Sequence, residues 1–176
     1  MKACRDLPDT AADRICRVDV PSSIYHAAVP GEPQGQDMAT DQTIRQLTFI
    51  DAEAVLERAQ RLLNAGDISE VMKTFASDVV VRFADFPETY GRPPLEAFLR
   101  ARFARQRNYR LQKQLRAVSG NVIVCYWDAE WEDGQNGRQM EGRGIELLTM
   151  RADEIAKWEA TFNVWRKGDA PSLPIV

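Results

Sequence analysis

Apolar residues recur at two different periods along this chain, and the change of period divides it into a helical part and a strand part. From Thr48 to about residue 105 the apolar positions follow the spacing of about 3.6 residues that is typical of helices. From Tyr109 onward apolar and polar residues alternate, as they do in strands. Helices first and strands afterwards predict an α+β fold, with helices packed on one face of a curved, mostly antiparallel sheet.

Three helices are predicted before the strand-rich part. The first begins at Thr48, which has capping-box spacing to Asp51 and is followed by an apolar stripe. A second, shorter helix begins at Asp67, and the β-branched run at 79–83 then predicts a strand. Pro93 suits the first turn of a third helix.

The second half of the chain predicts four strands with short links between them. Short links favour the pairing of consecutive strands, so an antiparallel meander is expected. The strands are expected at 109–118, 121–132, 138–150 and 154–166.

The two ends of the chain differ from its middle. Residues 1–45 have recurring prolines and no sustained periodicity, which predicts a disordered or loosely attached tail. A folded domain is expected at 46–168, followed by a short tail at 169–176. Met38 would make a sensible natural start, so one hypothesis is that residues 1–37 are not part of the natural protein.

The composition of the chain argues against some classes of protein. The net charge of −3 argues against a general nucleic-acid binder, and no apolar run approaches the length of a membrane span. Three cysteines without a spacing pattern favour reduced thiols and a cytoplasmic protein. The basic stretch at 92–116 has three interpretations: a solvated helix face, steering of an anionic ligand at a pocket mouth, or a nucleic-acid face.

Histidine is absent from the predicted domain, since the only one in the chain is His26. Catalytic triads built on histidine and Cys/His metal sites are therefore excluded there, and no metal or cofactor is expected. Acid–base chemistry would have to use Asp, Glu, Tyr, Lys or water.

A carboxylate, Asp85, stands where the first predicted strand runs into a Pro/Gly turn. Phe83 precedes it by two residues, and an apolar setting of this kind can raise the pKa of a carboxyl group into the range of a catalytic base. The alternative is a turn-initiating Asp that hydrogen-bonds backbone N–H groups.

Two predicted strands each have one apolar face and one polar or mixed face. In the strand at 121–132, Tyr126 and Asp128 share one face while the tryptophans occupy the other; in the last strand, Asn163 and Trp158 are separated in the same way. Either the apolar faces form the core and the polar faces meet solvent, or the polar faces line a pocket. In the second case a partner subunit would cover the Trp-rich face, and the protein would be a homodimer.

Together these segments resemble the nuclear-transport-factor-2-like superfamily, and in particular its SnoaL-like branch. The resemblance rests on the three helices, the Phe83-Ala-Asp-Phe-Pro87 strand end, the Gly91-Arg92 turn into a helix and the four final strands. It implies a cone-shaped α+β barrel with an apolar pocket, as in ketosteroid isomerases, limonene-epoxide hydrolases and polyketide cyclases.

The resemblance also implies site residues. Asp85 falls near the general base of the isomerases. Phe83, Tyr126 and Asn163 replace a Tyr, an Arg and an Asp that the epoxide hydrolases use, so that the full hydrolase set is missing. The expected catalytic residues are Asp85, Tyr126 and Asp128, and the expected substrate-binding residues are Phe83, Glu146, Trp158 and Asn163.

The expected function is therefore that of a small-molecule pocket protein, with a small apolar ligand as its partner. If catalytic, it would be a cofactor-independent isomerase, cyclase or hydrolase that uses a carboxylate base on a carbonyl or epoxide compound. The alternative is a non-catalytic ligand-binding or protein-interaction module of the same fold.

Overall fold

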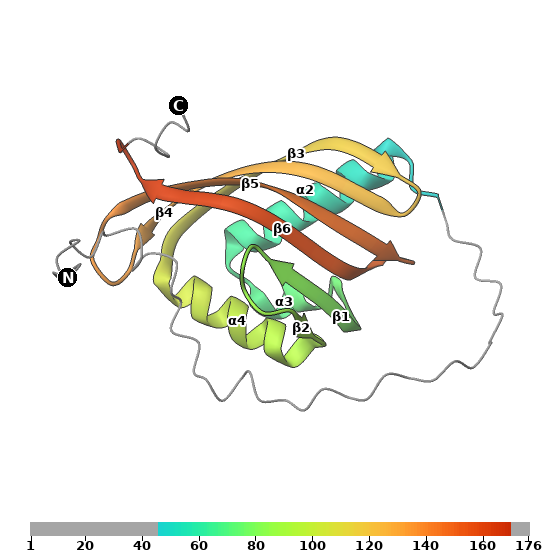
Figure 1. Cartoon of the computed structure of the whole chain (residues 1–176), viewed down its shortest axis with the longest axis horizontal. Helices are drawn as coiled ribbons and strands as arrows, with labels where there is room; N and C mark the ends of the chain where they lie inside the picture. The colour runs from blue at the N-terminus through green and yellow to red at the C-terminus, as the bar shows by residue number, and fades with distance from the viewer. Residues whose placement is uncertain (1–45, 170–176) are drawn as a thin grey trace, which may run out of the picture.

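The computed structural model describes residues 46–169, in which a curved sheet of six strands carries three helices (Figure 1). The expected tail at 1–45 and nearly all of the one at 169–176 lie outside the described residues. The helices are α2 (Phe49–Ala65), α3 (Ile68–Met72) and α4 (Arg92–Arg105). The strands are β1 (Phe75–Phe83), β2 (Thr89–Tyr90), β3 (Gln106–Ser119), β4 (Val122–Asp133), β5 (Gln139–Arg151) and β6 (Glu154–Arg166).

Helix α2 begins where the sequence predicted. The hydroxyl of Thr48 accepts a hydrogen bond from the Asp51 amide at 3.1 Å, and the Asp51 carboxylate accepts one from the Thr48 amide at 3.1 Å. This reciprocal capping box satisfies two N–H groups that a helix start leaves open. Gly66 ends the helix with a left-handed φ of 67°, a conformation that costs glycine little.

The sheet has the strand order β2-β1-β6-β5-β4-β3. Strands β3 to β6 pair in sequence as an antiparallel meander, which confirms the expectation drawn from the short links. Strand β1 instead pairs in parallel with β6, with Phe83 opposite Ala160, and β2 adds a short antiparallel edge. The parallel pair joins the two ends of the domain and brings the end of β1 beside the middle of β6.

The Trp-rich face of the sheet is the inner face. In β4, Trp127 and Trp131 are buried, whereas Tyr126 is half-buried and Asp128 is exposed on the opposite, outer face. The chain's own helices α2 and α4 lie over the inner face (Figure 1). The expectation that a second subunit covers the Trp-rich face is therefore wrong, and so is the expectation that the polar face lines the pocket.

Two glycines in β5 make room for the tryptophans. A Cβ atom at Gly142 would lie 3.2 Å from the Trp131 ring, and one at Gly144 would lie 3.0 Å from the Trp127 ring and 2.3 Å from the Thr161 carbonyl oxygen. The pairing of β4 with β5 runs through both glycines without a shift in register. The absence of a side chain at these two positions lets the indole rings pack close to the backbone of β5.

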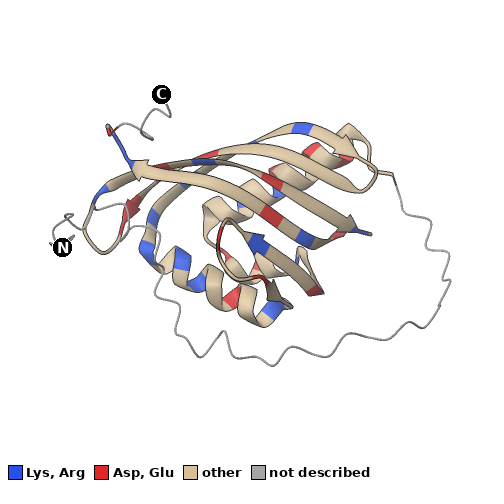
Figure 2. Cartoon of the chain, in the orientation of Figure 1, with Lys and Arg blue, Asp and Glu red and all other residues tan. Residues whose placement is uncertain are grey.

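Charged residues are distributed over most of the described structure. Lys and Arg follow α4 and the adjoining start of β3, and Asp and Glu are mixed with Lys and Arg on the remaining strands (Figure 2). Among residues 46–169, no helix has the length and apolar character needed to cross a membrane.

Candidate functional site: an aromatic cavity with two buried ion pairs

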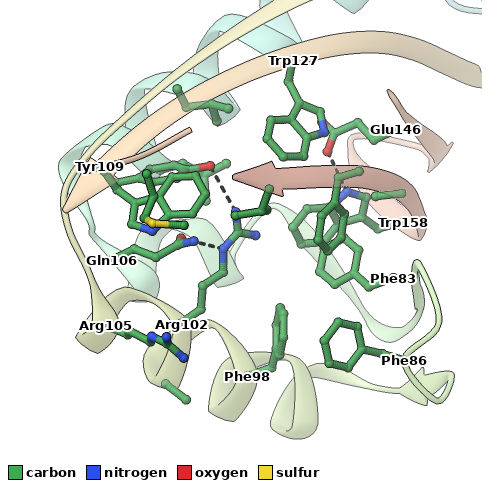
Figure 3. A pocket seen from close by; sticks show the side chains of 18 of the residues that line it. Phe83, Phe86, Phe98, Arg102, Arg105, Gln106, Tyr109, Trp127, Glu146 and Trp158 are labelled. Carbon is green, nitrogen blue, oxygen red and sulfur yellow. Dashed lines mark hydrogen bonds between the residues drawn. The ribbon is translucent and has the colours of Figure 1, made fainter. Parts of the chain in front are cut away.

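A cavity of about 110 Å³ lies between helix α4 and the inner face of the sheet (Figure 3). Its walls are mostly apolar and rich in aromatic rings, and edge-to-face contacts hold some of these rings; Phe83 and Trp158, for example, have centroids 4.4 Å apart. Such walls favour an apolar ligand, and a few polar groups among them would fix its orientation. The aromatic lining includes Phe83, Phe98, Tyr109, Trp127, Trp131 and Trp158.

The first polar group on the cavity wall is a buried ion pair between Lys113 of β3 and Glu146 of β5. Their side chains are only 4% and 3% exposed, and the ammonium contacts the carboxylate directly. The other Glu146 oxygen accepts a hydrogen bond of 2.9 Å from the indole N–H of Trp158, and the thiol of Cys125 lies 3.2 Å from the first. The carboxylate is thus held by three partners from three strands.

Burial changes the acid–base properties of this pair. Loss of hydration, together with the positive charge of Arg102, lowers the pKa of the Lys113 ammonium to about 8. An ionised Glu146 acts in the opposite direction, because an adjacent carboxylate favours the charged ammonium. Burial also raises the pKa of the Cys125 thiol, which keeps it protonated. A lysine whose pKa lies this close to neutrality can exchange protons under physiological conditions.

The second polar group is centred on Arg102, which reaches from α4 into the cavity (Figure 3). Its Nε donates to the Gln106 side-chain oxygen at 2.8 Å, and its Nη2 donates to the Tyr109 hydroxyl at 3.1 Å. The guanidinium carbon also lies 5.5 Å from the centre of the Tyr109 ring, within the range of a cation–π contact. Burial raises the pKa of Tyr109, so its hydroxyl stays protonated.

A second ion pair closes one end of the cavity, between Arg105 of α4 and Asp133 at the end of β4. Two hydrogen bonds, of 3.1 and 2.8 Å, join the guanidinium to the carboxylate. They lower the pKa of Asp133, whose carboxylate also accepts from the Gln135 amide at 2.9 Å. This pair ties the end of α4 to the β4–β5 link, and both of its charges are already satisfied.

Three of the expected substrate-binding residues lie in the cavity. Phe83, Glu146 and Trp158 all line it, although Glu146 makes contacts that the sequence did not predict. Strand alternation brings them together, because each occupies an inner-face position of its strand and the register places Glu146 directly opposite Ala160, two residues from Trp158.

The other expected site residues lie outside the cavity. Asp85 is exposed in a turn closed by a 2.8 Å hydrogen bond from the Phe86 amide to the Phe83 carbonyl. Because both phenylalanines of this turn point inward, Asp85 between them faces solvent. On the outer face, Tyr126 donates to Asp128 at 3.2 Å, and Asn163 is exposed. The expected pocket position is wrong for all four residues.

Lys113 and Arg102 were not among the expected site residues. Both fall in the basic stretch at 92–116, which was interpreted only as a whole, as a solvated helix face, a pocket mouth or a nucleic-acid face. A signal for Lys113 was present: it lies in phase with Tyr109 and Leu111, which are buried inner-face residues of the same strand. A charged residue in phase with an apolar face is a candidate for a buried functional group. For Arg102 the helical pattern gave no comparable signal.

Comparison with known proteins agrees with this architecture. The family model of the SnoaL-like domain matches residues 56–158, which is more than half of the chain. No curated protein matches the sequence significantly.

Solved structures with the same fold are distant in sequence. A candidate polyketide cyclase from Xanthomonas campestris is 19% identical over 64% of this chain and 90% of its own, with a TM-score of 0.56. SalBIII, an epoxide hydrolase/cyclase-like enzyme of pyran ring formation in salinomycin, is 13% identical over 66% and 97%, with a TM-score of 0.59. A candidate isomerase from Bacillus subtilis is 13% identical over 65% and 88%, also with a TM-score of 0.59.

At these identities the structures are evidence for the fold alone. The nuclear-transport-factor-2-like fold that they share is the one described above, with helices over a curved sheet. Together with the match of the family model, this shows that the chain belongs to the SnoaL-like family.

Proposed function

We propose that this protein binds a small, largely apolar carbonyl compound in the aromatic cavity and transfers a proton with the Lys113–Glu146 pair. The observation that carries the proposal is the position of this pair, which is buried and lies on the wall of the cavity beside aromatic rings. A buried ion pair is costly to desolvate and adds little stability compared with apolar residues of the same size. A role in chemistry accounts for its presence better than a role in stability.

The chemistry follows from the two partners. The Glu146 carboxylate removes a proton from the carbon next to the carbonyl group, and the Lys113 ammonium stabilises the negative charge that develops on the carbonyl oxygen. Return of the proton at another carbon gives an isomer, and attack of the enolate carbon on a second electrophile in the same molecule gives a ring. Glu146 thus takes the place of the carboxylate base that the sequence assigned to Asp85.

A second candidate function, a non-catalytic ligand-binding module, is favoured by one observation. The Glu146 carboxylate is already engaged by Lys113, Trp158 and Cys125, so these contacts compete with a substrate proton for its oxygens. In that case the pair would orient a ligand carbonyl without reacting with it.

For both candidate functions we propose a cytoplasmic location. The buried free thiol of Cys125 suits a reducing compartment, which the cysteine content also favours.

Proton exchange separates these candidates. Ketones with acidic α-protons, such as phenylacetone, are incubated with the protein in D₂O, and loss of the α-proton signal is followed by NMR. We expect the wild type to accelerate exchange and Glu146→Gln to lower the rate by about 100-fold or more. The control is Glu130→Gln, which changes an exposed carboxylate on the outer face of β4.

Two results would count against this mechanism. Absence of exchange with the wild type, together with calorimetric binding of the ketone, would leave the ligand-binding module. Full activity of Glu146→Gln would remove Glu146 as the base.

A further inference from the structure

Charges on the cavity wall do not cancel, and the excess is positive. Five charged side chains line the cavity: Arg102, Arg105, Lys113, Asp133 and Glu146. Arg105 is paired with Asp133, and Lys113 is paired with Glu146. Arg102 is therefore the charge that remains.

Arg102 is bonded only to neutral acceptors within the described residues. It uses Nε for the Gln106 amide oxygen and one Nη2 hydrogen for the Tyr109 hydroxyl. A guanidinium has five N–H donors, and the others have no hydrogen-bond partner in residues 46–169. Arg100, two residues earlier on the same helix, shows the ordinary case, since it faces solvent and pairs with Glu96 at 2.6 Å.

The Arg102 side chain points into the cavity, so its unbalanced positive charge can interact with a ligand there. Figure 3 shows its guanidinium inside the cavity, between Tyr109 and Gln106 on one side and Phe83 and Trp158 on the other. Arg102 is half-buried among these side chains, and partial loss of hydration strengthens the attraction of a cation to an anion that enters the same space. Its free N–H groups form a planar fork of the shape that binds a carboxylate through two parallel hydrogen bonds.

We propose that the ligand of this cavity is an organic monocarboxylate with an apolar, ring-containing body, and that Arg102 binds its carboxylate. A single excess positive charge matches a monoanion. A phosphate dianion would need a second cation, but Lys113 and Arg105 are occupied by their own carboxylates. This proposal shares one assumption with the proposed function, that the cavity is the ligand site. It adds the chemical class of the ligand.

The arrangement also connects the carboxylate site to the proton-transfer pair. Arg102 is close enough to Lys113 for its charge to lower the pKa of that ammonium. A carboxylate bound to Arg102 neutralises this charge, so that the pKa of Lys113 rises when the ligand binds. Binding of the acid would therefore keep Lys113 protonated for its role beside the carbonyl group.

A matched pair of ligands tests the proposal. Binding of 4-phenylbutyrate and of 4-phenylbutyramide, which differ in charge and little in shape, is measured by isothermal titration calorimetry at pH 7. We expect the wild type to bind the carboxylate at least about tenfold more tightly than the amide. Arg102→Gln should abolish this preference while leaving amide binding within about twofold, since the aromatic walls are unchanged.

Two further variants serve as controls. Arg100→Gln removes the same charge from an exposed position of α4 and should keep the full preference. Arg102→Lys keeps the charge without the fork and should keep only part of it. Thermal unfolding of each variant checks that it is folded, and the comparison of the two ligands on the wild type needs no variant.

Each result bears on the proposal in a defined way. Equal binding of carboxylate and amide by the wild type, or a preference that survives Arg102→Gln, would overturn the Arg102 site and leave the cavity as a site for neutral ligands. Binding of neither compound would overturn both this inference and the proposed ligand cavity.

Discussion

Two lysine–glutamate pairs on the same sheet show how differently one chemical pair behaves on its two faces. On the inner face, Lys113 and Glu146 are 4% and 3% exposed. On the outer side, Lys167 and Glu130 lie 2.7 Å apart and are 49% and 43% exposed. Burial lowers the pKa of Lys113 to about 8, whereas the hydrogen bond with Glu130 raises the pKa of Lys167 above its ordinary value.

The two pairs differ in how well water hydrates their charged groups. Lys167 remains hydrated, so the nearby carboxylate only favours its charged form, and the pair contributes little to stability. Lys113 has lost its hydration and depends on Glu146 for compensation, so that each partner becomes essential to the other. The inner pair is therefore sensitive to any change of charge, including the arrival of a ligand, and the outer pair is not.

The largest expected effect comes from breaking the inner pair on one side. Lys113→Met or Glu146→Leu leaves an uncompensated buried charge and should lower the free energy of unfolding by about 3–5 kcal/mol. The double variant removes both charges and should recover most of that loss. Urea unfolding of the two single variants and the double variant gives the coupling between the residues.

The outer pair is the control for that cycle. Lys167→Met and Glu130→Leu, alone or together, should leave the unfolding curve nearly unchanged, since both groups stay in water. A double inner variant as unstable as its single variants would contradict the argument, because it would make the ion pair a structural requirement of the fold.

An intermediate effect is expected in the titration of the two lysines. With lysine ¹³Cε labels, NMR should show Lys113 losing its proton near pH 8 and Lys167 above its ordinary 10.5. Since the pKa of Lys113 is lower in the folded state, the unfolded chain binds more protons between about pH 8 and 10.5. The Lys113 contribution to the free energy of unfolding therefore rises with pH in that window.

Catalysis should follow the same titration. If Lys113 acts as the ammonium, proton exchange falls as the pH rises through about 8. A Lys113 midpoint at or above the ordinary value would show that Glu146 outweighs burial, and the inner and outer pairs would then differ only in exposure.

The smallest effect on the domain itself is expected at the apolar part of the outer face. Ile145 and Leu147 are 45% and 38% exposed there, and Leu147 is paired with Val124. We propose this patch as the contact of a homodimer, in place of the buried Trp-rich face. Leu147→Asp should turn a dimer into a monomer in sedimentation velocity, with little change in thermal unfolding of the domain.

Asn163→Asp is the matched control for the dimer contact. It introduces the same charge at another exposed outer-face position, on β6, and should change neither mass nor stability. A wild type that sediments as a monomer would remove the dimer proposal and leave the cavity unaffected.

The sequence by itself determined the local structure of this protein. The capping box at Thr48, the period-two alternation of the final strands and their short links are properties of neighbouring residues, and the helices and the antiparallel meander follow from them. It also separated the two faces of β4 correctly, with Trp127 on one side and Asp128 on the other.

Only the tertiary structure decided which face the helices cover, and with it which residues form the site. Alternation sorts side chains into two sets but does not say which set lies inside, since a pocket can be lined by either. The docking of α4 placed Arg102 over the Trp-rich face, and the sheet brought Lys113 of β3 to Glu146 of β5 across β4. Contacts of this kind join residues far apart in the chain, and local periodicity carries no information about them.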